Sequence, residues 1–449
     1  MHPETIANTA PAPVGFGESL KYWLKLGFIS FGGPAGQIAM MHLELVERRR
    51  WISEQRFLHS LNYCMLLPGP EAQQLATYIG WLMHGVKGGV AAGVLFVLPS
   101  LLILIALTWI YLSFGSLPAV AGILYGIKPA VTAIVVFAAY RIGSRALKHG
   151  ALWAIAAGAF VAIFALNIPF PYIVLGAAVL GMAGGKIMPD KFKAAGGHGT
   201  SGKDYGAALI DDDTPTPSHA RFSWARLSAL TIIGLMLWGG AMALLSGQPT
   251  LFTMGGFFTK AALMTFGGAY AVLPYVYQGG VEQYHWLTAQ QMIDGLALGE
   301  TTPGPLIMVV AFVGFIGGWG KELFGSATLF WAGAAGAGVA TFFTFLPSFL
   351  FILAGGPLVE RTHGDLKFTA PLTAITAAVV GVILNLAVFF AWHTLWPHAT
   401  GAAPFSGQFE WFSALLGVTA FIALWRYQAG VVKVIGACAL LGLGYSMLA

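Results

Sequence analysis

Charged residues are scarce in this sequence. Only 9% of its 449 residues are Asp, Glu, Lys or Arg, whereas 57% are hydrophobic, and the mean hydropathy is +0.74. Soluble domains carry about 25% charged residues, so a water-facing surface of the ordinary kind cannot be built here. Apolar runs at 93–111, 120–140 and 151–166 approach the ~20 residues that cross a hydrocarbon core. The composition predicts an all-α integral membrane protein.

Cysteine is nearly absent as well, and Cys64 and Cys438 form no redox or metal spacing. The histidines lack metal-ligand spacing, and no Ser/His/Asp arrangement suggests catalysis. Residues 197–204 lack the final Ser or Thr of a phosphate-binding loop. The net charge of +5 is concentrated in loops, where it reports membrane orientation. We therefore predict no enzyme activity, no metal, no cofactor and no nucleic-acid partner.

What the sequence does contain is one short pattern that occurs twice, at a constant offset of 235 positions. Phe31-Gly32-Gly33, Trp51 and Pro68-Gly69-Pro70 recur as Phe266-Gly267-Gly268, Trp286 and Pro303-Gly304-Pro305. In both copies helix-breaking residues fall inside apolar stretches. Broken apolar helices at matching places in two halves are typical of the binding site of a secondary transporter.

Hydropathy divides the chain into five parts. We expect a polar tail at 1–15, a first transporter repeat at 16–187, a hydrophilic linker at 188–224, a connecting transmembrane helix at 225–246 and a second repeat at 247–449. Each repeat holds about six helical segments. The linker is rich in Gly, Asp, Ser and Pro and predicts a flexible, solvated segment. An unpaired span between two even-numbered halves predicts inverted repeats, and the repeats would be parallel if 225–246 did not span.

Lys and Arg are missing from alternate loops, near 113–117, 167–170, 246–252 and 396–408. The positive-inside rule then places the N-terminus in the cytoplasm and the C-terminus outside. Arg48-Arg49-Arg50 breaks this rule if residues 16–45 span the membrane once. The conflict disappears if 16–45 and 54–83 are re-entrant hairpins, with arms of about 14 residues or about 21 Å. Thirteen full spans remain the alternative.

The breaks indicate what could be bound. Proline fits the first turn of a helix, so Pro34, Pro70 and Pro305 predict new helical arms whose free N–H groups and dipoles attract an anion. The alternative is that Gly and Pro only kink helices or let them pack closely. Candidate substrate-binding residues are the two kinds of break and the polar residues beside them: Gly32, Gly33, Pro34, Pro68, Gly69, Pro70, Gln73, Gln74, Gly267, Gly268, Thr301, Thr302, Pro303, Gly304 and Pro305.

Charges inside the apolar blocks have two readings each, because they are costly in a membrane. Lys128 either neutralises the bound anion, snorkels or pairs with a carboxylate. Lys25 and Lys260 either snorkel to the interface or take part in transport, and Arg48, Arg49 and Arg50 either mark topology or attract anions to a cytoplasmic mouth. Glu71 and Glu300 are either stabilised by helix dipoles or carry protons. For Thr301 and Thr302 the alternative is a bond to their own backbone.

Together these motifs resemble the chromate ion transporter family in its long two-domain form. The resemblance rests on Phe31–Ala35, Arg48–Trp51, Leu67–Gln74, Thr265–Gly268 and Glu300–Pro305, and it covers about residue 18 to the C-terminus. It implies export of chromate across the bacterial inner membrane, driven by the membrane potential or the proton gradient, and chromate resistance. Protons and a homodimer are further partners left open.

The residues alone indicate a small anion, and chromate and sulfate are nearly isosteric tetrahedral dianions. Backbone N–H groups discriminate such anions poorly. Transport or exchange of sulfate or another oxyanion is therefore the alternative function. One departure from internal symmetry is that Pro34 is matched by Ala269, which leaves open whether both halves bind the anion.

Overall fold

A computed structural model describes residues 10–31, 33–189, 192, 205–215, 217–266, 268–362, 369–398, 403 and 405–448. Gly32, Gly267 and the 197–204 motif lie outside these residues. The described chain consists of helices and the turns and loops that join them, with an isolated parallel bridge between Ile52 and Ile210. Within it, seven helices are long and apolar enough to cross a membrane. The expected all-α membrane architecture is confirmed.

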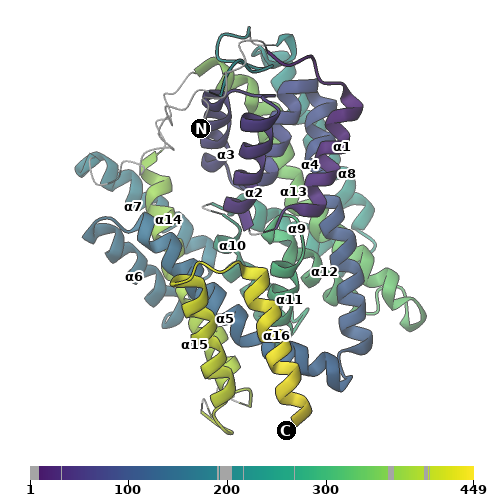
Figure 1. The fold of residues 1–449 in the computed structure, drawn as a ribbon, viewed down its shortest axis with the longest axis vertical. Helices are drawn as coiled ribbons and strands as arrows, with labels where there is room; N and C mark the ends of the chain where they lie inside the picture. Colours follow the sequence, from purple (N-terminus) through teal and green to yellow (C-terminus); the bar gives the residue numbers. More distant parts are fainter. Residues whose placement is uncertain are drawn as a thin grey trace, which may run out of the picture.

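The first half runs from α1 to α7 (Figure 1). Its elements are α1 (Phe16–Ile29), α2 (Gly33–His42), the π-helical turn η1 (Leu43–Arg48), α3 (Glu54–Leu66), α4 (Glu71–Phe114), α5 (Pro118–Ala146), α6 (Gly150–Phe164) and α7 (Phe170–Ile187). The backbone of α4 is not helical at His84 and Gly85. This break divides α4 into a short arm and a long spanning segment. It lies close to residue 83, where the sequence predicts the end of the second hairpin.

The second half repeats this order after the connecting helix α8 (Trp224–Leu245), which is long and apolar enough to span. Its elements are α9 (Pro249–Leu263), α10 (Ala269–Tyr277), η4 (Gln278–Gln283), α11 (Ala289–Thr301), η5 (Leu306–Met308), α12 (Val309–Gly320), η6 (Ser326–Thr328), α13 (Leu329–Thr362), α14 (Thr369–Leu395), α15 (Trp411–Trp425) and α16 (Val431–Leu448). The π-helical turns η1 and η4 occupy equivalent positions, so the repeat in the sequence is also a repeat in structure.

The first half opens with two short helical hairpins that leave and return on one side. Arg49 Nη1 lies 3.2 Å from Glu18 Oε1, so the chain comes back after α2 to the place where α1 starts. The rings of Phe16 and His84 are 5.5 Å apart, so the short arm of α4 returns to the same side. The structure therefore has the re-entrant arrangement rather than thirteen spans. The arginine cluster lies beside the start of α1, as the positive-inside rule requires.

The long helices of the two halves run in opposite directions. Trp109, near the end of α4, packs on Phe330 at the start of α13, with ring centroids 6.1 Å apart. Earlier in α4, a Cβ on Gly89 would lie 3.0 Å from Leu353, late in α13. Equivalent helices that run antiparallel make the halves inverted repeats, as expected. In Figure 1 the C-terminal end of α16 accordingly lies at the bottom, while α1 and α3 lie near the top.

The halves also exchange helices. α5 packs against α15 and α16 of the second half, and its counterpart α14 packs against α6 and α7 of the first half. Figure 1 shows α15 and α16 beside α5. Small residues permit this close approach: a Cβ on Gly126 of α5 would lie 2.7 Å from the Cα of Gly442 in α16. Because each half completes the other, the turns of both halves are held in fixed relation.

In the linker at 188–224, which the sequence predicts to be flexible and solvated, the structure describes residues 188–189, 192, 205–215 and 217–224, and Ile210 lies against the first half. Ile210 pairs with Ile52, and the N–H groups of Leu209 and Ile210 donate to the carbonyls of Arg50 and Trp51. Ile210 is buried. A short turn, η3 (Ser218–Ala220), lies further along. A few apolar residues and main-chain hydrogen bonds hold residues 207–212 in place despite their polar neighbours, and we call these residues the linker strap.

The inverted hairpins make a prediction about access from the two sides of the membrane. Arg48→Cys and Gln283→Cys stand at equivalent, exposed positions of the two halves. In a variant lacking Cys64 and Cys438, an impermeant maleimide should label position 48 only from the cytoplasmic side and position 283 only from the opposite side. Labelling of both positions from one side would contradict the inverted arrangement.

Candidate functional site

A reciprocal pair of main-chain hydrogen bonds ties the broken segments of the two halves together. The N–H of Gly69 donates to the carbonyl of Thr265 at 2.7 Å, and the N–H of Gly304 donates to the carbonyl of Ser30 at 2.9 Å. The repeat relates the two donors, Gly69 and Gly304, and also the two acceptors, Ser30 and Thr265. Each Pro-Gly-Pro turn therefore lies on the chain just before the Phe-Gly-Gly of the other half. We call these places the Ser30 crossing and the Thr265 crossing.

Glycine is required in both Pro-Gly-Pro turns. The φ angles are +127° at Gly69 and +103° at Gly304, a region that side chains disfavour. A Cβ on Gly304 would lie 2.6 Å from Ser100 Cβ, and one on Gly69 would clash with the Ser348 hydroxyl. Ser100 and Ser348 end two Leu-Pro-Ser motifs, in α4 and α13. Sequence reading missed this second repeated motif because its copies are separated by more than 235 positions.

The prolines mark the starts of helical arms, as predicted. Pro34 lies in the first turn of α2, Pro70 is the N-cap of α4, and Pro305 is the N-cap of η5. The first N–H groups of α4 and η5 have no helical partner, and within the described chain no side chain caps either helix. The Met308 N–H is the exception in η5, because it donates to the Pro305 carbonyl. The amides of Gly69 and Gly304 are not free donors, because they bond across the halves.

The Ser30 crossing is neutral, polar and short of hydrogen-bond partners. Ser30, Gln37 and Ser100 are fully buried. Gln37 Nε2 donates to the carbonyls of Gly304 at 2.5 Å and Ser30 at 3.2 Å. Gln37 Oε1 and the two serine hydroxyls have no partner among the described residues. A buried polar group left unpaired costs about 1–3 kcal/mol, so such a cluster is expected where a ligand completes the bonds.

Sequence reading missed these three side chains. Each is a single polar residue inside a strongly apolar block, and that was the available signal. A search for residues repeated at the fixed offset does not find Gln37, because Val272 stands at the matching position. The position of Gln37 across from Gly304 depends on the crossing of the halves, which the offset does not reveal.

The Thr265 crossing carries carboxylates instead. Glu71 Oε1 lies 4.0 Å from the position that a Cβ on Gly268 would take, at the N-cap of α10. Tyr270, in the first turn of α10, donates its hydroxyl hydrogen to Glu300. Both carboxylates thus lie near the start of one helix, where the dipole stabilises negative charge. Their counterparts across the repeat are uncharged: Leu306 and Met65.

Gln73 and Gln74 are fully buried in the first turn of α4, beside the first Pro-Gly-Pro. Gln74 Nε2 donates to the Pro68 carbonyl at 2.8 Å, so this glutamine braces its own turn. Gln73 Nε2 donates to Thr77 Oγ1 at 2.9 Å, one helical turn away. The amide oxygens of both glutamines lack partners among the described residues. Gln73 and Gln74 therefore lie where the sequence places them, close to a break.

The other predicted residues divide between the turns and the surface. The hydroxyls of Thr301 and Thr302 donate to carbonyls of their own helix at 2.9 and 3.0 Å, which is the alternative reading of both residues. Gly33, with φ +69°, bends the chain before α2. Lys25 and Lys260 are exposed on α1 and α9, which favours snorkelling over contact with the buried crossings.

The arginine cluster lies at the surface and is paired. Arg48 Nη1 is 3.3 Å and Arg49 Nε is 2.8 Å from carboxylate oxygens of Glu44. The hydrogen bond from Arg49 lowers the pKa of Glu44 below its usual value. Arg50 Nη1 donates to the Ala207 carbonyl of the linker strap at 3.4 Å. Arg48 and Arg49 are thus paired with Glu44, and Arg50 contacts the linker.

Lys128 has a carboxylate neighbour, as one of its readings expected. Its Nζ lies 3.8 Å from Asp294 Oδ1, across the interface between α5 and α11. Tyr111, in the last turn of α4, donates its hydroxyl hydrogen to Asp294 Oδ2 at 2.9 Å. Sequence reading did not single out Asp294, although it is a charged residue within an apolar block.

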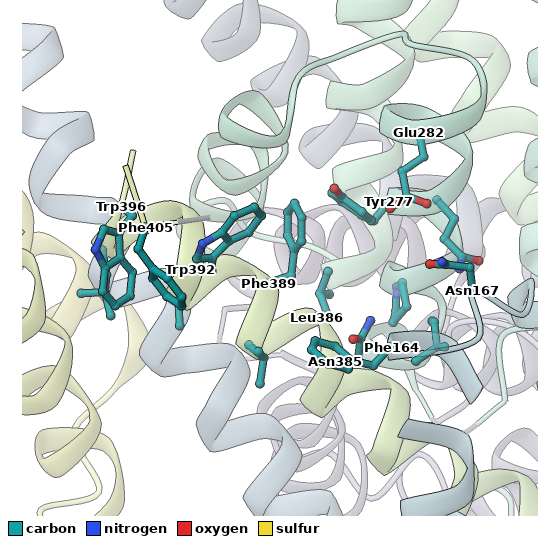
Figure 2. A pocket seen from close by; sticks show the side chains of 16 residues that line it. Phe164, Asn167, Tyr277, Glu282, Asn385, Leu386, Phe389, Trp392, Trp396 and Phe405 are labelled. Atoms are coloured by element: carbon teal, nitrogen blue, oxygen red, sulfur yellow. The ribbon is translucent and has the colours of Figure 1, made fainter. Parts of the chain in front are cut away.

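A separate cavity of about 640 Å³ lies among α6, α10 and the end of α14. Figure 2 shows Trp392, Trp396 and Phe405 at one end and Glu282 and Asn167 at the other. Its lining residues include no Lys or Arg. A cavity whose charged lining residue is a carboxylate does not suit an anion, so the crossings are the better site.

Comparison with known proteins agrees with this architecture. The family model described as chromate transporter matches residues 18–182 and 252–443, once in each half. A chromate transport protein of Cupriavidus metallidurans is 32% identical over 395 residues, covering 87% of this chain and 86% of that protein. One of Pseudomonas aeruginosa is 31% identical over 445 residues, covering 98% and 94%. An uncharacterized transporter of Methanocaldococcus jannaschii is 25% identical over 370 residues, covering 82% and 83%. No solved structure shows significant similarity to the chain.

The crossings predict a severe effect of one methyl group. In Gly304→Ala the new Cβ would meet Ser100 in a backbone region that alanine disfavours. Transport should fall at least about tenfold, which corresponds to only about 1.4 kcal/mol, while the protein still inserts. Gly338→Ala, where nothing lies within 4 Å, is the matched control. Vesicle flux per amount of inserted protein measures the effect, and unchanged flux in Gly304→Ala would show that the turn need not be tight.

Proposed function

The chain belongs to the chromate transporter family, and on that premise we propose that it exports chromate across the bacterial inner membrane and confers chromate resistance. Inverted repeats with broken helices are the architecture of secondary transporters. The relatives from Cupriavidus metallidurans and Pseudomonas aeruginosa, named chromate transport proteins, supply the substrate. We infer transport, and no enzyme activity, on the same grounds.

The observation that carries the proposal is the Ser30 crossing. A tetrahedral dianion offers acceptor oxygens in all directions. The hydroxyls of Ser30 and Ser100 and the open N–H groups at the start of η5 are donors for such an anion, while both amide hydrogens of Gln37 hold the Ser30 and Gly304 carbonyls in place. Hydrogen bonds to a charged group contribute about 1.5–3 kcal/mol each, more than neutral ones. The two buried serine hydroxyls therefore gain hydrogen bonds when the anion enters.

The Thr265 crossing is proposed not to hold the anion. Glu71 and Glu300 lie there. A carboxylate about 4 Å from one negative charge of a bound anion repels it by about 4 kcal/mol at an effective dielectric constant of about 20. A dianion would meet this repulsion twice over. We infer one anion site per chain, formed by the Phe-Gly-Gly side of the first half and the Pro-Gly-Pro turn of the second.

The proposed direction follows from charge. A membrane potential with a negative interior supplies about 2.3 kcal/mol per charge for each 100 mV, or about 4.6 kcal/mol for a dianion leaving the cell. The potential alone is therefore sufficient to drive export. Glu71 and Glu300, where a proton would remove the repulsion, are the candidates for coupling to a proton gradient instead. The arginine cluster would draw anions to the cytoplasmic side.

Transport or exchange of sulfate or another tetrahedral oxyanion is the second candidate function. Nothing in hydroxyl and amide donors separates two isosteric dianions strongly. Everted vesicles that contain the protein, loaded with no oxyanion and energised by a membrane potential or a proton gradient in turn, test both. Chromate accumulation in excess of sulfate supports the proposal, and equal sulfate flux favours the alternative. Accumulation of neither oxyanion would overturn transport altogether.

Two glutamines offer a matched test of where the anion binds. Gln37 and Gln74 each brace one Pro-Gly-Pro turn through its main-chain carbonyls, but only Gln37 belongs to the neutral crossing. Gln37→Leu should raise the KM for chromate by about 10- to 100-fold, because the Ser30 crossing loses the two amide hydrogen bonds that hold its main-chain carbonyls. Gln74→Leu should lower kcat without a comparable rise in KM. Equal effects of the two substitutions on KM would contradict a single anion site at the Ser30 crossing.

A further inference from the structure

Lys128 and Asp294 form an ion pair that is loosely made. The separation of 3.8 Å between Nζ and Oδ1 is too long for a hydrogen bond. Asp294 Oδ1 is buried and has no hydrogen-bond partner among the described residues, while Oδ2 accepts from Tyr111. The side chain of Asp294 is 5% exposed and that of Lys128 is 26% exposed. The carboxylate is thus held in place by Tyr111, and the ammonium is the more accessible partner.

The pair lies between the Ser30 crossing and one side of the membrane. Tyr111 is in the last turn of α4, and Asp294 is in the second turn of α11. α11 ends at Thr301 and leads directly into the Pro-Gly-Pro turn of the Ser30 crossing. The loop after α4 has no Lys or Arg, which places this end of the helices outside. Asp294 and Lys128 therefore lie on the outer side of the Ser30 crossing, beside the helix that leads into it.

The surroundings of Asp294 leave Lys128 as the available positive charge. α4, α5, α12, α14 and α16 pack on α11. The groups whose charge or hydrogen bond acts on Asp294 are Lys128 of α5 and Tyr111 of α4. α12 has no ionisable side chain, and α14 contributes His393, whose carbonyl accepts from Gln290. The ionisable side chains of α16 are Lys433, Cys438 and Tyr445.

We propose that Lys128 is an outer subsite for the transported dianion, and that Asp294 occupies its charge when the subsite is empty. This inference rests on the proposed function, because it assigns a second position to the same anion. When the anion arrives, the Lys128 ammonium turns from Asp294 Oδ1 to the anion. A buried carboxylate left without its cation is strongly disfavoured, so Asp294 takes a proton from the outer water onto Oδ1. When the anion leaves, the proton returns to that water and the pair re-forms.

The arrangement explains why a lysine lies inside a membrane helix without a hydrogen-bonded carboxylate. A tight pair would hold Lys128 permanently, and a lysine with no carboxylate nearby would retain the dianion. A loose pair gives an anion subsite that releases its occupant. It also ties anion occupancy to protonation at one named group.

A double substitution separates this subsite from a plain structural ion pair. Lys128→Met should raise the KM for chromate at least about tenfold, and Lys128→Arg should restore most of the affinity. Asp294→Asn should keep or lower the KM and weaken its dependence on pH. The double variant Lys128→Met with Asp294→Asn should remain as weak as Lys128→Met alone. Lys433→Met serves as the control for loss of a lysine.

Several outcomes would overturn the subsite. If Lys128 only neutralises Asp294, the double variant regains the wild-type KM, because neither charge is then left unpaired. An unchanged pH dependence in Asp294→Asn would exclude the proton step. Flux normalised to inserted protein separates both from misfolding, and retained affinity in Lys128→Arg shows that charge matters. If the wild-type protein moves neither chromate nor sulfate, the proposed function fails; if it moves chromate while the double variant is restored, only the subsite fails.

Discussion

Two reciprocal hydrogen bonds, from Gly69 to Thr265 and from Gly304 to Ser30, fix the relation between the halves of this protein. Each joins the Pro-Gly-Pro turn of one half to the chain before the Phe-Gly-Gly of the other. Irregular backbone inside a membrane must find partners within the protein, because lipid offers none. Here each half supplies the partners of the other. The exchange of α5 and α14 between the halves reinforces the same dependence.

The crossing is symmetric in its main chain and asymmetric in its side chains. Near one bond lie Ser30, Gln37 and Ser100, all neutral and incompletely bonded. Near the other lie Glu71 and Glu300. A duplicated scaffold can therefore carry two different sites, and we propose that the neutral one binds the oxyanion and the acidic one excludes it. The mismatch between Pro34 and Ala269, visible in the sequence, is a small part of this divergence.

Much of the architecture was predictable from the sequence for physical reasons. The two halves follow from the apolar runs and the helix-breaking residues at a fixed offset. Their inversion and the hairpins follow from the distribution of Lys and Arg. The offset relates equivalent residues, however, and equivalent residues are not the ones in contact. Contacts across the crossing, such as Gln37 with Gly304, therefore stayed hidden. The linker strap was hidden too, because its few buried residues, among them Ile210, are outnumbered by the polar residues of the linker.

The charged residues show the same limit of sequence analysis, because their partners usually lie in other segments. Sequence alone gave Lys128 several possible roles, and only the fold supplies Asp294 and Tyr111 as neighbours. Arg48 and Arg49 proved to be paired at the surface with Glu44. A charge in a membrane protein is thus interpretable once its partner is known, and that partner usually belongs to another segment of the chain.

The most direct measurement is an experimental structure with chromate bound, in which chromium is located by its anomalous scattering. The account predicts a chromium peak at the Ser30 crossing, with chromate oxygens within hydrogen-bond distance of the Ser30 and Ser100 hydroxyls. The Thr265 crossing should be empty of chromium. A peak beside Glu71 and Glu300, or chromium bound only at sites remote from both Pro-Gly-Pro turns, would contradict it.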